Sequence, residues 1–189
     1  MERSILQSLS LIAALSLGAI SSANALEYTS LDTEASNIKF TYSQMNVKMN
    51  GSFSTLKANE LHFDPAQPEN AKLSLEVDLT SIDAGYADAN TELAKDEWLA
   101  LAQYPVATFN ANTIEALGDN TYQVSGELSI KGHSQTITAP FSFNEEGNSG
   151  VFTGNFTFQR NDFAIGEGQW KKSNIVANEI EITFHIVTK

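Results

Sequence analysis

Polar and apolar residues alternate along most of the chain, a pattern that predicts β-strands with one buried face. Residues 73–79 show it most clearly, because every second side chain from Leu73 to Leu79 is apolar. This register places Leu75 and Val77 inside the fold and Glu76 outside. Similar runs occur at residues 38–42, 45–49, 122–130, 137–143, 152–158 and 180–186.

Turn-forming residues separate these runs, and one segment has a different period. Asn50-Gly51 predicts a hairpin turn because both residues tolerate positive φ. Further turns are expected at residues 132–134 and 145–150. Between Asp88 and Gln103 the apolar residues recur at helical spacing, and Pro105 ends that pattern. The sequence therefore predicts one short amphipathic helix within an otherwise all-β chain.

Strands that each have one apolar face must close into a barrel or pair into a sandwich. Because most predicted strands follow one another as hairpins, the pattern favours an up-and-down antiparallel barrel. With about eight strands, the interior can hold side chains or one small ligand, as in lipocalins. We therefore expect an eight-stranded, lipocalin-like barrel with one short helix, formed by residues 26–189 as a single domain.

The first 25 residues predict a cleaved export signal. A weakly positive start is followed by an apolar stretch around residues 11–20, and Ala23 and Ala25 supply the small residues that signal peptidase needs. An uncleaved membrane anchor is the alternative, but a spanning helix needs about 20 predominantly apolar residues. This stretch is shorter and contains serines. We expect cleavage after Ala25 and a periplasmic protein without stable membrane insertion.

The composition excludes several classes of function. The formal net charge of −12 argues against nucleic acid as a partner and against electrostatic docking on anionic lipid. The absence of cysteine excludes disulfides, thiolate metal sites and a catalytic thiol.

Catalytic motifs are also missing from the sequence. It contains no G-x-S-x-G elbow, H-E-x-x-H helix or phosphate-binding G-x-x-x-x-G-K loop. The spacing of the three histidines does not indicate a metal site. Asp78 and Asp83 border a strand end, where a turn or a cap explains them. We therefore expect no cofactor, no metal and no catalytic residue.

Most of the 11 phenylalanines fall on predicted inward faces. They form either a packed aromatic core or the wall of an apolar tunnel, in which Gly126 and Gly154 leave space on the same strand faces. Trp98 and Tyr104 are candidates for the rim, where an amphipathic ring can meet a polar headgroup. The predicted ligand-lining residues are Phe40, Val47, Phe53, Phe63, Leu75, Val77, Trp98, Tyr104, Phe109, Leu128, Ile130, Phe141, Phe143, Phe156, Phe158, Phe163, Ile182 and Phe184.

Several short motifs, in order along the mature chain, carry a resemblance to a known family. They are Gly51-Ser52-Phe53, Phe63-Asp64-Pro65, Val77-Asp78 with Ser81-Ile82-Asp83, Tyr104-Pro105, Gly126 to Gly132, and Arg160 to Gly166. The chain resembles the YceI-like family of periplasmic polyisoprenoid-binding proteins. The resemblance implies an eight-stranded barrel with a helix, a polyprenyl or isoprenoid-quinone-like chain inside it, and often a homodimer. Two residues depart from the family pattern, namely Trp98, where phenylalanine is common, and Ala164, where glycine is usual.

Three functions remain open at this point. The favoured one is a carrier that holds a long isoprenoid chain inside the barrel. The second is a stress-associated interaction protein whose barrel is filled by its own side chains. The third is a hydrolase or isomerase, for which the sequence shows no nucleophile and base pair.

Overall fold

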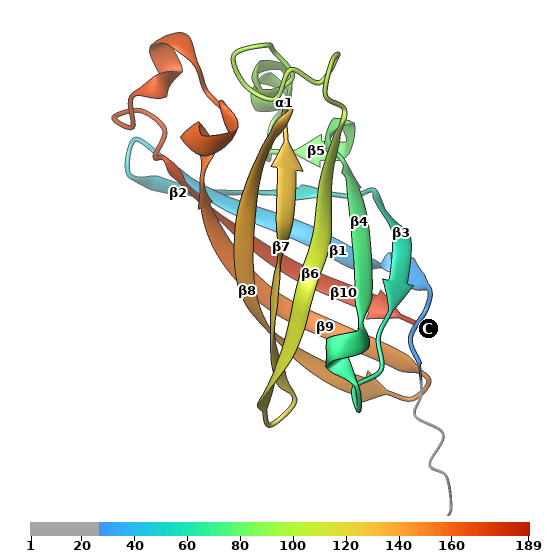
Figure 1. Ribbon diagram of the computed structural model, residues 1–189. Helices are drawn as coiled ribbons and strands as arrows, with labels where there is room; N and C mark the ends of the chain where they lie inside the picture. The colour runs from blue at the N-terminus through green and yellow to red at the C-terminus, as the bar shows by residue number, and fades with distance from the viewer. Residues whose placement is uncertain (1–26) are drawn as a thin grey trace, which may run out of the picture.

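The computed structural model describes residues 27–189, so the predicted signal peptide and its cleavage site lie outside the described residues. One antiparallel sheet curls into a half-barrel around an apolar interior (Figure 1), in the order β3-β4-β6-β7-β8-β9-β10-β1-β2-β5. The strands are β1 (Leu31–Gln44), β2 (Val47–Phe53), β3 (Leu56–His62), β4 (Lys72–Asp78), β5 (Ile82–Asp83), β6 (Val106–Gly118), β7 (Thr121–Ile130), β8 (His133–Glu146), β9 (Ser149–Gln159) and β10 (Glu179–Thr188). Short 3₁₀ turns lie at Pro68–Asn70, Leu79–Ser81, Arg160–Phe163 and Gly168–Lys171.

The all-β, lipocalin-like architecture is confirmed, with ten strands in place of eight. No predicted run covers β5 or β6. In β6, the pairing with β7 shifts register between Ala111 and Thr113, so inward residues do not alternate regularly along the strand. Because of this irregularity, the sequence of β6 lacks the regular alternation of apolar and polar residues that predicts a strand. Near one end, the residues that precede β1 contact the residues that follow β3, where Tyr28 and Phe63 exchange two backbone hydrogen bonds of 3.0 and 3.1 Å.

The prediction of a hairpin turn at Asn50-Gly51 was wrong. The chain turns instead at Met45 and Asn46, whose φ angles are 51° and 65°, and Asn50-Gly51 lies inside β2. Gly51 pairs with Phe40 across the β1–β2 ladder, and a Cβ on Gly51 would collide with the Phe40 ring. The glycine at this position is therefore needed for packing and not for a turn.

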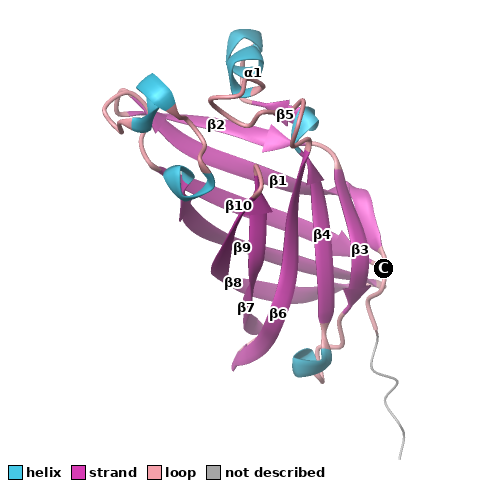
Figure 2. Cartoon of the chain, turned by 45° about the horizontal axis from the view of Figure 1, so that its top comes forward, coloured by secondary structure: helices cyan, strands magenta, loops and turns pink. Residues whose placement is uncertain are grey.

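The helix predicted for residues 88–103 is shorter in the structure. Helix α1 spans Ala87–Leu93 and is followed by irregular turns as far as Gln103. Trp98, Leu99 and Ala100 are all buried. Three consecutive residues of an α-helix are spread over about 200° of its circumference, so a helix could not bury all three on one face. The turns that follow α1 achieve this burial. Figure 2 shows α1 at the same end of the barrel as β5 and the loop between β9 and β10.

The barrel is filled by aromatic side chains at the end opposite α1. The basal aromatic cluster consists of Tyr28, Phe63, Tyr122, Phe141, Phe143 and Phe152. Ring centroids lie 4.9 Å apart between Phe63 and Phe143 and 4.8 Å apart between Phe143 and Phe152. Such pairs each add about 0.5–1.5 kcal/mol beyond the burial of their area. This end of the barrel is thus a packed aromatic core, one of the two interpretations that the sequence left open.

Candidate ligand-binding cavity

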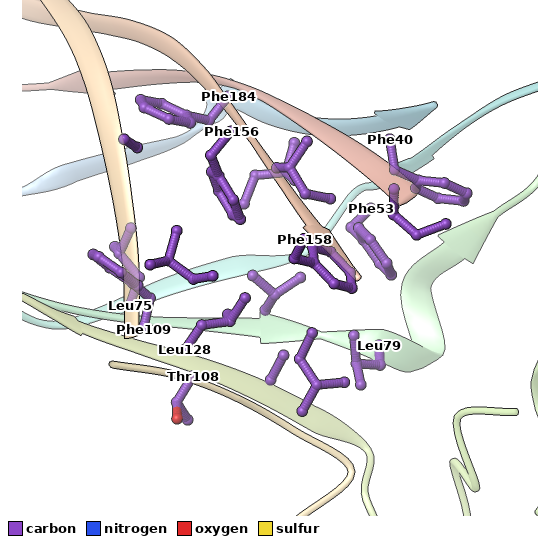
Figure 3. A pocket seen from close by; sticks show the side chains of 18 of the residues that line it. Phe40, Phe53, Leu75, Leu79, Thr108, Phe109, Leu128, Phe156, Phe158 and Phe184 are labelled. Carbon is purple, nitrogen blue, oxygen red and sulfur yellow. The ribbon is translucent and has the colours of Figure 1, made fainter. Parts of the chain in front are cut away.

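A cavity of about 300 Å³ occupies the barrel between α1 and the basal aromatic cluster. Its lining residues run from Leu73 near one end of β4 to Leu79 just beyond the other end. A strand advances about 3.3 Å per residue, so this wall is roughly 20 Å long. In Figure 3, phenylalanine and leucine side chains project into this space from several strands. The interior therefore offers an elongated, apolar site.

All but four of the predicted ligand-lining residues surround this cavity. Those that do are Phe40, Phe53, Phe63, Leu75, Val77, Trp98, Phe109, Leu128, Ile130, Phe141, Phe156, Phe158, Ile182 and Phe184. They come from eight of the ten strands, from Phe63 just after β3, and from the turns after α1. On β4, Leu75 and Val77 face the cavity, whereas the Glu76 carboxylate lies 3.7 Å from the Lys57 ammonium on the outer surface.

The other four predicted residues lie elsewhere. Phe143 belongs to the basal aromatic cluster, and Phe163 is buried edge-on against Phe158 at a centroid distance of 5.2 Å. Tyr104 packs near Gly132 and is 38% exposed. Val47 pairs with Gln44 beside the β1–β2 turn, where the barrel wall ends, and is 59% exposed. Position on an inward face was therefore not enough to place a residue at the cavity.

Strand glycines make room for three of the cavity rings. Phe184 pairs directly with Gly154 across the β9–β10 ladder, and a Cβ on Gly154 would lie 2.5 Å from the Phe184 ring. A Cβ on Gly126 would lie 2.7 Å from the Phe109 ring. A Cβ on Gly51 would likewise collide with the Phe40 ring. Because these rings lie over backbone without a side chain, they can lie against the barrel wall and leave the centre open.

The cavity opens beside α1. Tyr86, Ala89, Glu92 and Leu93 line it on the α1 side, and Trp170 lines it on the side of the β9–β10 loop. The Tyr86 side chain is 45% exposed. These residues were not predicted from the sequence because, apart from Trp98 and Tyr104 at the rim, most of the lining was expected on strands. A tryptophan in an otherwise polar loop was the one available signal for Trp170.

Arg160 fastens the loop on the other side of this mouth. Its guanidinium is fully buried and donates hydrogen bonds to the carbonyl oxygens of Ile165, Trp170 and Val176, at 2.7, 2.6 and 3.0 Å. Burial lowers the pKa of Arg160, but no carboxylate forms an ion pair with it among residues 27–189. The guanidinium carbon also lies 5.6 Å from the Trp98 ring centre. Trp98, a candidate for the rim, is therefore buried beneath the loop and only 5% exposed.

The described residues show no sign of a metal site. No group of three or more histidine, aspartate or glutamate side chains is placed to hold an ion within residues 27–189. Asp78 caps the turn at Leu79–Ser81 by accepting a 2.9 Å hydrogen bond from the Thr80 backbone N–H. In the same part of the chain, no helix is long and apolar enough to cross a membrane.

Comparison with known proteins agrees with this architecture. The family model described as the YceI-like domain matches residues 29–188. The chain belongs to the YceI-like family. The UPF0312 protein of Pseudomonas syringae pv. tomato is 30% identical to this YceI-like chain over 133 residues, which are 67% of this chain and 68% of that protein.

Two solved structures are similar to this YceI-like barrel. The crystal structure of Burkholderia cenocepacia BcnA superposes with a TM-score of 0.81 at 34% identity, covering 85% of this chain and all of that one. A polyisoprenoid-binding domain from Saccharophagus degradans, implicated in plant cell wall breakdown, has a TM-score of 0.68 at 19% identity. That match covers 86% of this chain and 97% of the domain, and it supports the fold.

Proposed function

We propose that this YceI-like protein is a carrier that holds one long isoprenoid chain, a polyprenyl or isoprenoid-quinone tail, inside its barrel. The observation that carries the proposal is the elongated cavity, whose wall is almost entirely aliphatic and aromatic. Such a wall recognises length and apolarity and offers few hydrogen bonds. The polyisoprenoid-binding description of the Saccharophagus degradans domain supports the choice of ligand class. The family assignment and the absence of a nucleophile and base pair in the sequence favour binding over catalysis.

The size of the cavity favours a thin and flexible ligand. A volume of about 300 Å³ is at the lower end of ligand pockets, so a fused-ring molecule fits it poorly. A 40-carbon tail at ~0.3 kcal/mol per heavy atom would bind with ~12 kcal/mol, in the nanomolar range. This value is a ceiling, because carbons outside the barrel contribute nothing. Burial of apolar surface supplies the affinity, so binding should respond little to salt.

The proposal extends to the cellular location. Residues 26–189 act in the periplasm after the signal peptide is removed, as the family assignment and the N-terminal sequence pattern support. N-terminal sequencing of the exported protein should begin at Leu26. Intact Met1 in the membrane fraction would contradict export. A homodimer, which the family resemblance suggests, would give twice the chain mass in light scattering.

Native mass spectrometry of protein purified from its own host tests the proposed cargo. We expect a retained lipid whose mass fits a polyprenyl or quinone species and which organic solvent extracts. The second candidate, an interaction protein with a filled barrel, predicts an unliganded chain. A protein that remains unliganded after incubation with quinone, and is still folded by circular dichroism, would overturn the carrier function.

A further inference from the structure

The barrel mouth is bordered by an exposed patch that is both apolar and basic. It consists of Met45, Val47 and Lys48 from the β1–β2 hairpin and Lys171, Lys172 and Ile175 from the β9–β10 loop, and we call it the mouth patch. Met45 is 74% exposed, Val47 59% and Ile175 39%. Side chains of this kind are normally covered when they lie together, so their grouping indicates a surface that meets another one.

Backbone contacts hold the two segments of the patch side by side. The Met45 N–H donates to the Ile175 carbonyl at 2.7 Å, and the Ala177 N–H donates to the Ser43 carbonyl at 2.9 Å. Between these bonds, Gln44 and Val176 form an isolated antiparallel bridge. In Figures 1 and 2 the β9–β10 loop and the β1–β2 hairpin lie together at the mouth end of the barrel. The two segments of the patch therefore lie side by side, although their residues are far apart in sequence. Val47 and Lys48, which are consecutive on β2, extend from opposite faces of that strand at its end.

The charge of the patch is opposite to that of the whole protein. The chain carries a net charge of −12, yet Lys48, Lys171 and Lys172 are exposed here and form no ion pair among residues 27–189. Lysines elsewhere are mostly neutralised, for example Lys57 by Glu76 and Lys189 by Asp32. Glu167, the nearest acid in the loop sequence, pairs with Lys131 at 2.8 Å, and its charge also acts on Lys171. Lys48 and Lys172 thus keep uncompensated positive charge beside apolar side chains.

The patch is continuous with the cavity. Gln44 and Val176, which join its two segments, both line the cavity, and so does Trp170, next to Lys171. A flat surface that contacts the patch would lie directly against the opening. Helix α1, on the other side of the mouth, carries Asp88 and Glu92 and no lysine, although Glu92 pairs with Lys95 just beyond the helix. An anionic surface would therefore contact the patch and leave α1 in water.

We propose that the mouth patch docks this protein on an anionic lipid bilayer, with the cavity opening held against the headgroups. Exposed apolar side chains insert into the interface and the lysines attract anionic headgroups, the combination that peripheral lipid-binding surfaces use. A second copy of the chain is a poor occupant, because a two-fold interface would bring six of these lysines together. Net charge alone predicted no docking on anionic lipid, and the local distribution of charge reverses that expectation.

Sedimentation with vesicles tests the docking surface, whatever the cavity carries. Purified protein is mixed with vesicles of phosphatidylglycerol and phosphatidylcholine, and separately with phosphatidylcholine alone. We expect binding to the anionic vesicles that weakens as salt rises. The triple variant K48Q/K171Q/K172Q should bind them roughly a hundredfold more weakly, since each lysine near an anionic surface contributes about a factor of five to ten.

The matched control is K39Q/K57Q/K189Q, which removes the same charge from exposed lysines outside the patch and outside the cavity lining. It should bind anionic vesicles nearly as well as the wild type. Both triple variants should keep the wild-type thermal midpoint and lipid retention, which separates loss of docking from loss of fold or of cargo. Equal weakening in the two variants, or no preference of the wild type for anionic vesicles, would overturn the proposal. A dimer that only K48Q/K171Q/K172Q dissociates would instead assign the patch to contact between copies.

Discussion

Ala164 adopts a backbone conformation that favours glycine. Its φ and ψ are 53° and 31°, in the left-handed region, where it ends the 3₁₀ turn Arg160–Phe163. In that region the Cβ of an L-residue crowds the following carbonyl, at a cost of about 1–2 kcal/mol. The departure from the glycine usual in the family is therefore a small local strain. The Ala164 carbonyl still accepts a 2.7 Å hydrogen bond from the Lys131 ammonium.

Replacing Ala164 by glycine should stabilise the protein. Relief of the left-handed strain exceeds the added backbone entropy of glycine in the unfolded chain, so we expect a net gain of about 0.5–1 kcal/mol. For a domain of this size, that gain raises the thermal midpoint by about 2–3 °C. The control is Ala116→Gly on β6, where φ is not positive and glycine should lower the midpoint. A lower midpoint for Ala164→Gly would contradict the assigned strain.

At the scale of elements, the β9–β10 loop is held in place by two buried cationic side chains. One is Arg160, and the other is Lys131, whose side chain is only 7% exposed. The Lys131 ammonium lies 2.8 Å from the carboxylate of Glu167 in the loop. The hydrogen bond and charge of Lys131 hold the pKa of Glu167 below its ordinary value. A depressed carboxylate pKa contributes stability that is complete above the unfolded value, near 4.5, and is lost as the pH falls through the folded value.

Glu167→Gln should therefore lower the thermal midpoint at neutral pH and have less effect in acid. At pH 7 the variant leaves the Lys131 ammonium without its carboxylate, whereas in acid the wild type loses the same ion pair as the pH falls through the lowered pKa of Glu167. The measurement is the thermal midpoint of both proteins between pH 3 and 7, with Glu115→Gln, on an exposed strand position, as the control. A constant difference between wild type and Glu167→Gln across this range would exclude the ion pair as the cause.

Elements could be predicted from the sequence where their pattern is local. The prediction failed where a contact with a residue distant in sequence determines the local structure. Alternation located β4 and β7–β10, because apolar residues that face the barrel interior alternate with polar residues along most of each strand. Asn50-Gly51 has strong turn propensity, but the glycine is required beneath the Phe40 ring of the neighbouring strand. Burial of Trp98 likewise depends on Arg160, a partner 62 positions away that no periodicity reveals.

In the whole molecule, aromatic side chains serve two purposes. Near the termini they pack into the basal aromatic cluster, and near α1 they line an open cavity; Phe63, Phe141 and Phe152 lie at the boundary and belong to both. Inward faces could be predicted from the sequence, but the boundary between packed core and cavity could not. Phe141 and Phe143 lie two residues apart on the same face of β8, yet only Phe141 lines the cavity. That boundary depends on how rings from several strands meet, for instance Phe143 with Tyr28 at 5.2 Å.

Filling the cavity should weaken lipid binding without unfolding the barrel. In Figure 3, Leu75 of β4 and Phe156 of β9 both project into the cavity, so a tryptophan at either position would occupy ligand space. Leu75→Trp adds six heavy atoms and Phe156→Trp adds three, so together they should displace about nine carbons of the ligand, worth ~2.7 kcal/mol or about a hundredfold in affinity. Because the new atoms enter open space, we expect the thermal midpoint of Leu75→Trp/Phe156→Trp to change little.

The measurement is the quantity of quinone retained after gel filtration, compared with the wild type. Leu117→Trp, at an exposed position near the end of β6, adds an indole outside the barrel and should retain wild-type amounts. A folded double variant that retains as much quinone as the Leu117→Trp control would place the ligand outside this cavity.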